Sequence, residues 1–126
     1  MQQAKILVVE DDPDIMRILV QCLTTGGHQV VQAYGAEDAL RKVEAQRFDL
    51  ILTDLAMPKM SGVELIYDLK NNPQRKKIPV LAVTAHVWDA IAQSALRVGC
   101  NGIISKPFNT KQLLQEVHKH LQPAGE

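Results

Sequence analysis

The regular alternation of short apolar runs with amphipathic stretches constrains the fold of this chain more than any other feature. The apolar runs are rich in β-branched residues, which is typical of buried strands. They are Lys5 to Glu10, Gln29 to Ala33, Asp49 to Asp54, Ile78 to Thr84 and Gly102 to Ser105. Strands that alternate with helical patterns predict βαβ units, and therefore a parallel sheet with helices on both faces.

The helices are predicted from apolar spacing and from their end signals. After Pro13, Ile15, Ile18, Leu19, Cys22 and Leu23 fall on one helical face, and Gly26-Gly27 suits the end of that helix. A capping-box pattern, Ser61 with Glu64, opens another helix, and Asn109 can cap the last one. The remaining helical patterns run from Ala36 to Val43 and from Val87 to Val98. Five strands and five helices predict an α/β, doubly wound fold.

The composition limits the classes of function that this chain can have. The 126 residues fit one domain over residues 1–126, and 14 Lys+Arg balance 14 Asp+Glu, which argues against direct nucleic-acid binding. No apolar run approaches the ~20 residues of a membrane span, and the N-terminus does not resemble a signal peptide. Cys22 and Cys100 lie far apart, without a zinc or redox motif. A cytoplasmic protein without membrane insertion is expected.

Charged side chains follow the predicted strands at their carboxyl ends. Glu10, Asp11 and Asp12 follow the first strand, and Asp54 ends the third. Thr84 ends the fourth strand, and the fifth runs into Lys106. Because the carboxyl ends of parallel strands meet at one edge of the sheet, these groups are expected to converge there.

Carboxylates placed this close require a compensating charge. Two of them ~4 Å apart repel by about 4 kcal/mol at an effective dielectric near 20. Mg²⁺ removes this conflict, prefers oxygen ligands and keeps sites open for a phosphate oxygen. Lys106 and Thr84 can hold further phosphate oxygens. The pattern favours phosphoryl transfer, with a carboxylate as a possible nucleophile.

Each residue also has a structural interpretation. Asp12, just before Pro13, suits a helix N-cap, and Asp54 suits a turn before Met57 and Pro58. Thr84 and Lys106, taken singly, are ordinary residues of a strand end and of a surface. Their joint occurrence at matching strand ends favours the functional interpretation.

The segments VVEDD, DLAMPKMSG, VTA and SKPF, in this order, resemble the receiver domain of two-component response regulators. The resemblance covers nearly the whole chain and is closest to stand-alone receivers of the chemotaxis or sporulation type. It implies a flavodoxin-like fold with a five-stranded parallel sheet in the order 2-1-3-4-5. It also implies phosphorelay signalling, in which Asp54 accepts a phosphoryl group from a histidine kinase or a histidine phosphotransfer protein.

The resemblance further implies a metal site and a phosphoryl site. Asp11, Asp54 and the backbone carbonyl of Ala56 match direct ligands of Mg²⁺ (or Mn²⁺), and Glu10 matches a ligand that acts through water. Thr84 and Lys106 match the residues that contact the phosphoryl group. The family often has a cis bond before the proline that matches Pro107. The chemistry expected is self-phosphorylation and self-dephosphorylation, without enzymatic turnover.

The partner surface implied by the resemblance is the face of the fourth helix, fifth strand and fifth helix. Bound phosphate adds about two negative charges, and the strand ends must shift for Thr84 and Lys106 to reach it. On this face we expect a downstream protein to bind, and a homodimer is possible. Its residues here are Trp88, Arg97, Ile103, Lys111 and Gln115. Trp88 suits either packing or a partner anchor.

Some positions depart from the family pattern or tune it. Ile103 stands where receivers usually carry a switch Tyr or Phe, so an aromatic flip cannot operate. Ala56 and His86 lie two residues after Asp54 and Thr84, where they are expected to affect the lifetime of the acyl phosphate; His86 otherwise suits an exposed position. His28, His118 and His120 show no site spacing, and the last two are expected to be solvated.

Three alternatives remain open. One is an Mg²⁺-dependent phosphohydrolase with Asp54 as nucleophile, although Ala56 replaces the second acid of the D-x-D motif and there is no room for a substrate cap. Another is a receiver fragment of a larger regulator. The third is a degenerate receiver that acts as a static scaffold, against which Asp11, Asp54, Thr84 and Lys106 argue.

Overall fold

The computed structural model of the chain describes residues 3–57, 60–85 and 89–121, and these form alternating strands and helices. The strands are β1 (Lys5–Val9), β2 (Gln29–Ala33), β3 (Leu50–Asp54), β4 (Val80–Thr84) and β5 (Gly102–Ser105). The helices are α1 (Pro13–Thr25), α2 (Ala36–Ala45), α3 (Gly62–Lys70), α4 (Ala90–Arg97) and α5 (Thr110–His120).

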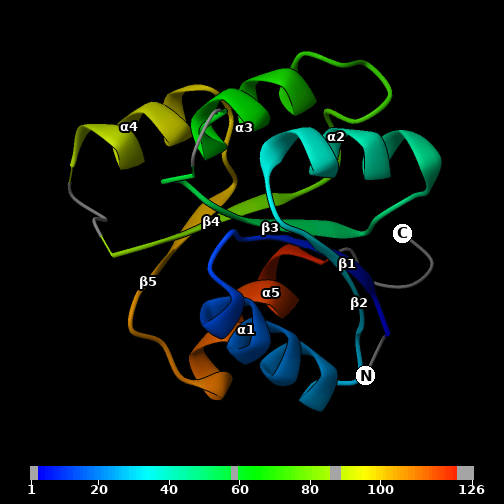
Figure 1. Cartoon of the computed structure of the whole chain (residues 1–126), viewed down its shortest axis with the longest axis vertical. Helices are drawn as coiled ribbons and strands as arrows, with labels where there is room; N and C mark the ends of the chain where they lie inside the picture. Colours follow the sequence, from blue (N-terminus) through cyan, green and yellow to red (C-terminus); the bar gives the residue numbers. More distant parts are fainter. Residues whose placement is uncertain (1–2, 58–59, 86–88, 122–126) are drawn as a thin grey trace.

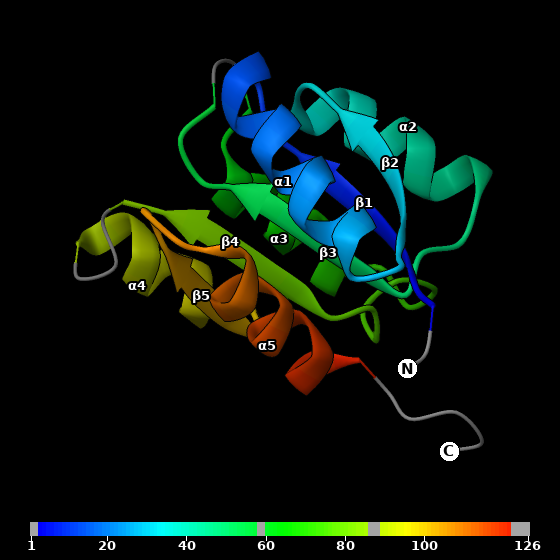
Figure 2. The same cartoon turned by 90° about the horizontal axis from the view of Figure 1, so that it is seen from below.

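The strands form one parallel sheet in the order β2-β1-β3-β4-β5. Helices α1 and α5 cover one face of it, and α2, α3 and α4 cover the other (Figure 1). Seen from below, α1 and α5 lie side by side in front of the sheet (Figure 2). The predicted doubly wound fold and strand order are therefore confirmed.

The side chains of the central strands alternate between two apolar layers. Ile6 and Val8 of β1 pack with α1 and α5, whereas Leu7 and Val9 pack with the helices of the opposite face. All residues of β3 and β4 are buried. Burial on both faces explains why these strands are continuous apolar runs.

Two predicted boundaries were wrong by a few residues. Helix α4 begins at Ala90 and not at Val87, because the side chain of Asp89 accepts a hydrogen bond from Ala92 N at 3.1 Å and caps the helix. Strand β4 begins at Val80 and not at Ile78, whose N–H donates to Arg75 O in the preceding turn. The predicted helical residues Val87 and Trp88 lie outside the described residues.

The predicted helix ends rest on identifiable side-chain bonds. Ser61 and Glu64 form the expected capping box at α3, and Asn109 forms one with Gln112 at α5. Gly27, just beyond α1, has a φ of 86°, a left-handed conformation that favours glycine. Among the described segments, no helix has both the length and the apolar character needed to cross a bilayer.

Candidate functional site

The register of the sheet brings the acidic ends of β1 and β3 to the same level. Val9 pairs with Thr53, so Glu10 follows β1 where Asp54 ends β3. On the other side of β3, Asp54 pairs with Val83, one residue before Thr84. Thr84 pairs with Ser105, and Lys106 follows directly. One edge of the sheet therefore carries these chemically active groups.

Glu10, Asp11 and Asp54 form a cluster of carboxylates at this edge. One carboxylate oxygen from each lies within 4.8 Å of the others. Glu10 is 1 % exposed and Asp54 is 9 % exposed, whereas Asp11 is exposed to solvent. The cluster is therefore buried at Glu10 and Asp54 and open to solvent at Asp11.

Lys106 supplies the positive charge of this cluster. Its Nζ lies 3.5 Å from Glu10 Oε1 and 3.7 Å from Asp54 Oδ1, and its side chain is 20 % exposed. The backbone N–H of Lys106 donates to Thr84 O at 2.9 Å, which ties it to the end of β4. One ammonium group against three carboxylates leaves the cluster with an excess of negative charge.

The pKa of Glu10 is raised above its ordinary value. Burial raises the pKa of Glu10 most, and the nearby Asp54 and Asp11 raise it further. The backbone N–H of Asp12, which donates to Glu10 Oε2 at 3.1 Å, and the ammonium of Lys106 lower it. The raised pKa of Glu10 therefore reflects mainly its burial, and the two neighbouring carboxylates add to the shift.

Asp12 caps the start of α1 with its side chain. Its Oδ1 accepts hydrogen bonds from Asp14 N at 2.8 Å and from Ile15 N at 3.2 Å. These bonds satisfy free N–H groups of the first helical turn. The N-cap interpretation of Asp12 is confirmed by these bonds.

The loop after Asp54 folds back closely onto the strand end. Gly62 N donates to Leu55 O at 3.1 Å, and a Cβ at Gly62 would overlap the carbonyl oxygen of Asp54. Thr53 Oγ1 also donates to Asp54 O, at 2.9 Å. The glycine of the recognised motif thus permits the close approach that fixes the backbone of Asp54.

Other residues singled out from the sequence lie as follows. Thr84 is buried at the end of β4, Ala56 is exposed after β3, and Ile103 is half-buried on β5. The bond between Lys106 and Pro107 is cis, as the resemblance implied. On the expected partner face, Arg97, Lys111 and Gln115 are exposed. His86 and Trp88 lie outside the described residues.

The expectation that His118 and His120 are solvated was wrong. Both rings are half-buried, and both bond to other segments of the chain. His118 Nε2 lies 2.9 Å from Nε2 of the buried His28, and His120 Nε2 lies 3.1 Å from Asn101 O. Local spacing carried no indication of these contacts, because they depend on how α5 packs against distant segments.

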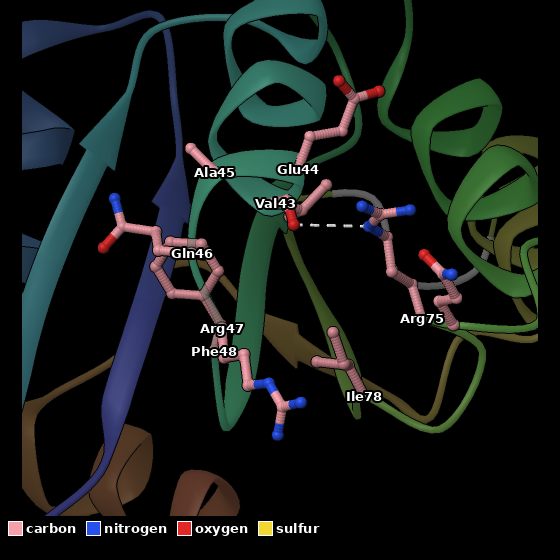
Figure 3. Close-up of a pocket in the computed structure, with 9 residues that line it drawn as sticks. Val43, Glu44, Ala45, Gln46, Arg47, Phe48, Arg75 and Ile78 are labelled. Atoms are coloured by element: carbon pink, nitrogen blue, oxygen red, sulfur yellow. Dashed lines mark hydrogen bonds between the residues drawn. The ribbon is translucent and has the colours of Figure 1, made fainter.

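A surface pocket of about 740 Å³ lies at the opposite, amino edge of the strands. It is formed by the end of α2, the segment before β3 and the segment before β4 (Figure 3). Within it, Arg75 Nε donates to Val43 O at 3.3 Å, so this arginine holds the end of α2. None of the lining residues belongs to the acidic cluster, so the pocket is separate from the candidate site.

Comparison with known proteins agrees with this geometry. The family model of the response regulator receiver domain matches residues 6–118. The polar-differentiation response regulator DivK of Brucella anthropi is 29 % identical over 94 % of this chain and 97 % of its own length. Other relatives are longer: the chain spans 45 % of one from Bacillus subtilis and 7 % of one from Dictyostelium discoideum.

Solved structures show the same fold. The chemotaxis protein CheY4 of Vibrio cholerae superposes with a TM-score of 0.89 at 32 % identity, covering 95 % of this chain and all of that one. The receiver domain of the sensor histidine kinase PA1611 of Pseudomonas aeruginosa has a TM-score of 0.87 at 26 % identity, covering 94 % and 97 %. That structure carries a magnesium ion in its active-site cleft. The chain belongs to the response regulator receiver domain family, whose function is phosphorelay signal transduction.

Proposed function

We propose that Asp54 is the phosphoacceptor of this receiver and that Lys106 and Thr84 hold the phosphoryl group. The observation that carries the proposal is the position of Asp54, which ends β3 nearly buried, with Lys106 Nζ at 3.7 Å. The exposed Asp11 leaves the cluster open to an incoming phosphodonor.

The donor set fits Mg²⁺ or Mn²⁺. Asp11 and Asp54 would bind the ion directly, the backbone carbonyl of Ala56 would add a third oxygen, and Glu10 would act through water. All are oxygen ligands, and they bring more negative charge than Lys106 balances. When bound, the ion neutralises the carboxylates and attracts phosphoryl oxygens.

The covalent step transfers one phosphoryl group to the Asp54 carboxylate. An oxygen of Asp54 forms a bond to phosphorus while the bond from phosphorus to the donor's histidine nitrogen breaks. The electron pair of that bond stays on the imidazole, which takes a proton. Lys106 and the Thr84 hydroxyl stabilise the charge on the phosphoryl oxygens, the usual source of rate enhancement in such transfers.

The output of the switch is proposed to be protein contact through α4, β5 and α5. The exposed apolar residues Ile91 and Leu96 lie on α4, together with the exposed Arg97. Apolar anchors with a charged rim are typical of protein-binding faces. The downstream target is therefore expected to be a protein, after phosphorylation by a histidine kinase or a phosphotransfer protein.

We expect incubation with acetyl phosphate and Mg²⁺ to add one phosphoryl group, measured by intact mass. The Asp54→Asn variant is expected to gain none, and EDTA is expected to prevent the gain in the wild type. The matched control is Asp68→Asn, an exposed acid on α3, which should gain the group as the wild type does. A phosphoryl group that persists in Asp54→Asn would place the acceptor elsewhere.

The same preparation tests whether the protein only phosphorylates its own Asp54 or also hydrolyses other phosphomonoesters. We expect no turnover of an exogenous phosphomonoester such as p-nitrophenyl phosphate, because Ala56 supplies no general acid next to Asp54. Sustained release of p-nitrophenol that is lost in Asp54→Asn would instead make the protein a phosphohydrolase.

A further inference from the structure

Two histidines from distant segments share a hydrogen bond where α5 meets the end of α1. His28 lies between α1 and β2 and is 4 % exposed, and His118 lies near the end of α5. Their Nε2 atoms are 2.9 Å apart, and their rings meet edge to face, with centroids 5.0 Å apart and an angle of 67°. The contact joins positions 90 residues apart in the sequence.

The hydrogen bonds of the pair assign the proton positions. The backbone N–H of Ala4 donates to His28 Nδ1 at 3.1 Å, so this nitrogen carries a lone pair. In a neutral imidazole the proton is then on Nε2, which donates to Nε2 of His118. His118 therefore accepts at Nε2 and carries its own proton on Nδ1. The observed arrangement requires both rings to be neutral.

Neither ring can take up a proton in this arrangement without breaking a bond. A proton on His28 Nδ1 would face the Ala4 N–H, and a proton on His118 Nε2 would face the N–H of His28. The Ala4 N–H also opposes metal binding at His28 Nε2, because a neutral ring that ligates through Nε2 must carry its proton on Nδ1. Protonation of either ring therefore breaks one of the hydrogen bonds of the pair.

Charged groups on the adjoining elements do not compensate a proton on the pair. On β1, Lys5 Nζ lies over the Phe48 ring, and on α5 Lys119 pairs with Glu116. On α1, Cys22 Sγ contacts Thr110 Oγ1, and β2 (Gln29–Ala33) contains no titratable residue. Among the described residues, His118 is the titratable group that acts electrostatically on His28.

The histidine pair lies where α5 packs against the end of α1. At Gly26, next to the pair, an added Cβ would lie 2.5 Å from Leu114 Cδ2 of α5. Leu114 of α5 thus packs closely on the end of α1, beside the histidine pair. Loss of the hydrogen bond between His28 and His118 would therefore weaken the same contact between α1 and α5.

We propose that His28 and His118 form a proton-sensitive latch that holds the C-terminal half of α5 against the turn after α1. With both rings neutral the latch is closed. Uptake of one proton places two donors face to face and releases α5. Because α5 also belongs to the proposed partner face, acidification would alter that face without phosphorylation of Asp54. The latch does not depend on the phosphorelay assignment.

The sign of the pH effect follows from the buried histidine. Burial and the neighbouring His118 lower the pKa of His28 below its ordinary value of 6.5. The unfolded or opened chain then binds the proton more readily than the closed one. The stability of the latch is complete above pH 6.5 and is lost as the pH falls from there toward the lowered pKa.

Hydrogen exchange of the α5 amides tests the latch. After correction for intrinsic exchange, residues 113–121 of the wild type are expected to exchange at least about threefold faster at pH 5.5 than at pH 7.5, as befits loss of one hydrogen bond. In His118→Gln the amide oxygen still accepts from His28, so protection at pH 7.5 should remain, and the pH effect should shrink because only His28 still titrates. In His28→Gln the buried titratable ring is gone and the pH effect should vanish. His118→Ala should exchange fast at both pH values.

Two comparisons keep the test decisive. His120→Gln, a change of the neighbouring histidine on α5, should keep the pH response of the wild type. If His118→Ala fails to fold, the comparison of the wild type with His28→Gln still decides. A wild-type pH response that persists in His28→Gln, or its absence from the wild type, would overturn the proposal.

Discussion

Gly62 contributes to the site because it has no side chain. Its backbone N–H bonds to Leu55 O, and its α-carbon lies so near β3 that a methyl group would meet the Asp54 carbonyl oxygen and Leu55 Cα. Backbone atoms cannot swing aside as a flexible side chain can. A larger residue at this position must therefore push the loop away from the strand end that carries Asp54.

We expect Gly62→Ser to lower the free energy of unfolding by about 2 kcal/mol or more, the usual range for overpacking against rigid atoms. Gly35→Ser is the matched control, because nothing lies within 4 Å of an added Cβ there and its φ of −173° suits any residue. The control should change stability by less than about 0.5 kcal/mol. Urea unfolding measures both, and equal midpoints would contradict the steric argument.

At the scale of elements, the start of α1 connects helix stability to the acidic edge. Asp12 caps the helix with its side chain while its backbone N–H donates to Glu10 Oε2. The cap therefore depends on the side chain, and the contact with the carboxylate cluster depends on the backbone. A substitution at Asp12 can separate these two contributions.

Asp12→Ala is expected to reduce the free energy of unfolding by about 1 kcal/mol, because two N–H groups of the first turn lose their acceptor. Asp12→Ser should recover most of that loss, since a hydroxyl oxygen also caps. Thermal or urea unfolding measures the difference. Similar stabilities of the Ala variant and the wild type would show that α1 starts without its cap.

The comparison of sequence and structure also belongs to this scale. The strands, the capping box at Ser61 and the cap at Asn109 were predicted, because burial on two faces and capping leave local patterns. The start of α4 was predicted wrongly, because the helical spacing of apolar residues begins at Val87 whereas the helix is capped at Asp89. The contact of His28 with His118 was not predictable, since it depends on how two helices pack and not on spacing.

At the scale of the whole molecule, folding is what assembles the metal site. Glu10 and Asp11 follow β1 and Asp54 ends β3, so the three carboxylates meet only when β1 pairs with β3. The roles proposed for them stay predictions until binding is measured. A cation that binds only the folded chain must stabilise it by mass action.

Mg²⁺ at ten times its dissociation constant is expected to raise the free energy of unfolding by about 1.4 kcal/mol, and EDTA should remove the gain. Asp11→Asn should reduce the gain strongly, because it deletes the exposed carboxylate of the cluster. Thermal unfolding with and without Mg²⁺ measures the effect. An equal gain in Asp11→Asn and the wild type would mean that the ion binds elsewhere.

The contact of Lys106 Nζ with Glu10 Oε1 closes the acidic edge across 96 positions of sequence. During synthesis the chain leaves the ribosome from its N-terminus, so the acids emerge long before their lysine. In a nascent chain the acidic edge therefore lacks Lys106 until β5 has been made and has paired with β4. A chain that ends before β5 lacks Lys106, and we expect such a chain not to accept a phosphoryl group from acetyl phosphate.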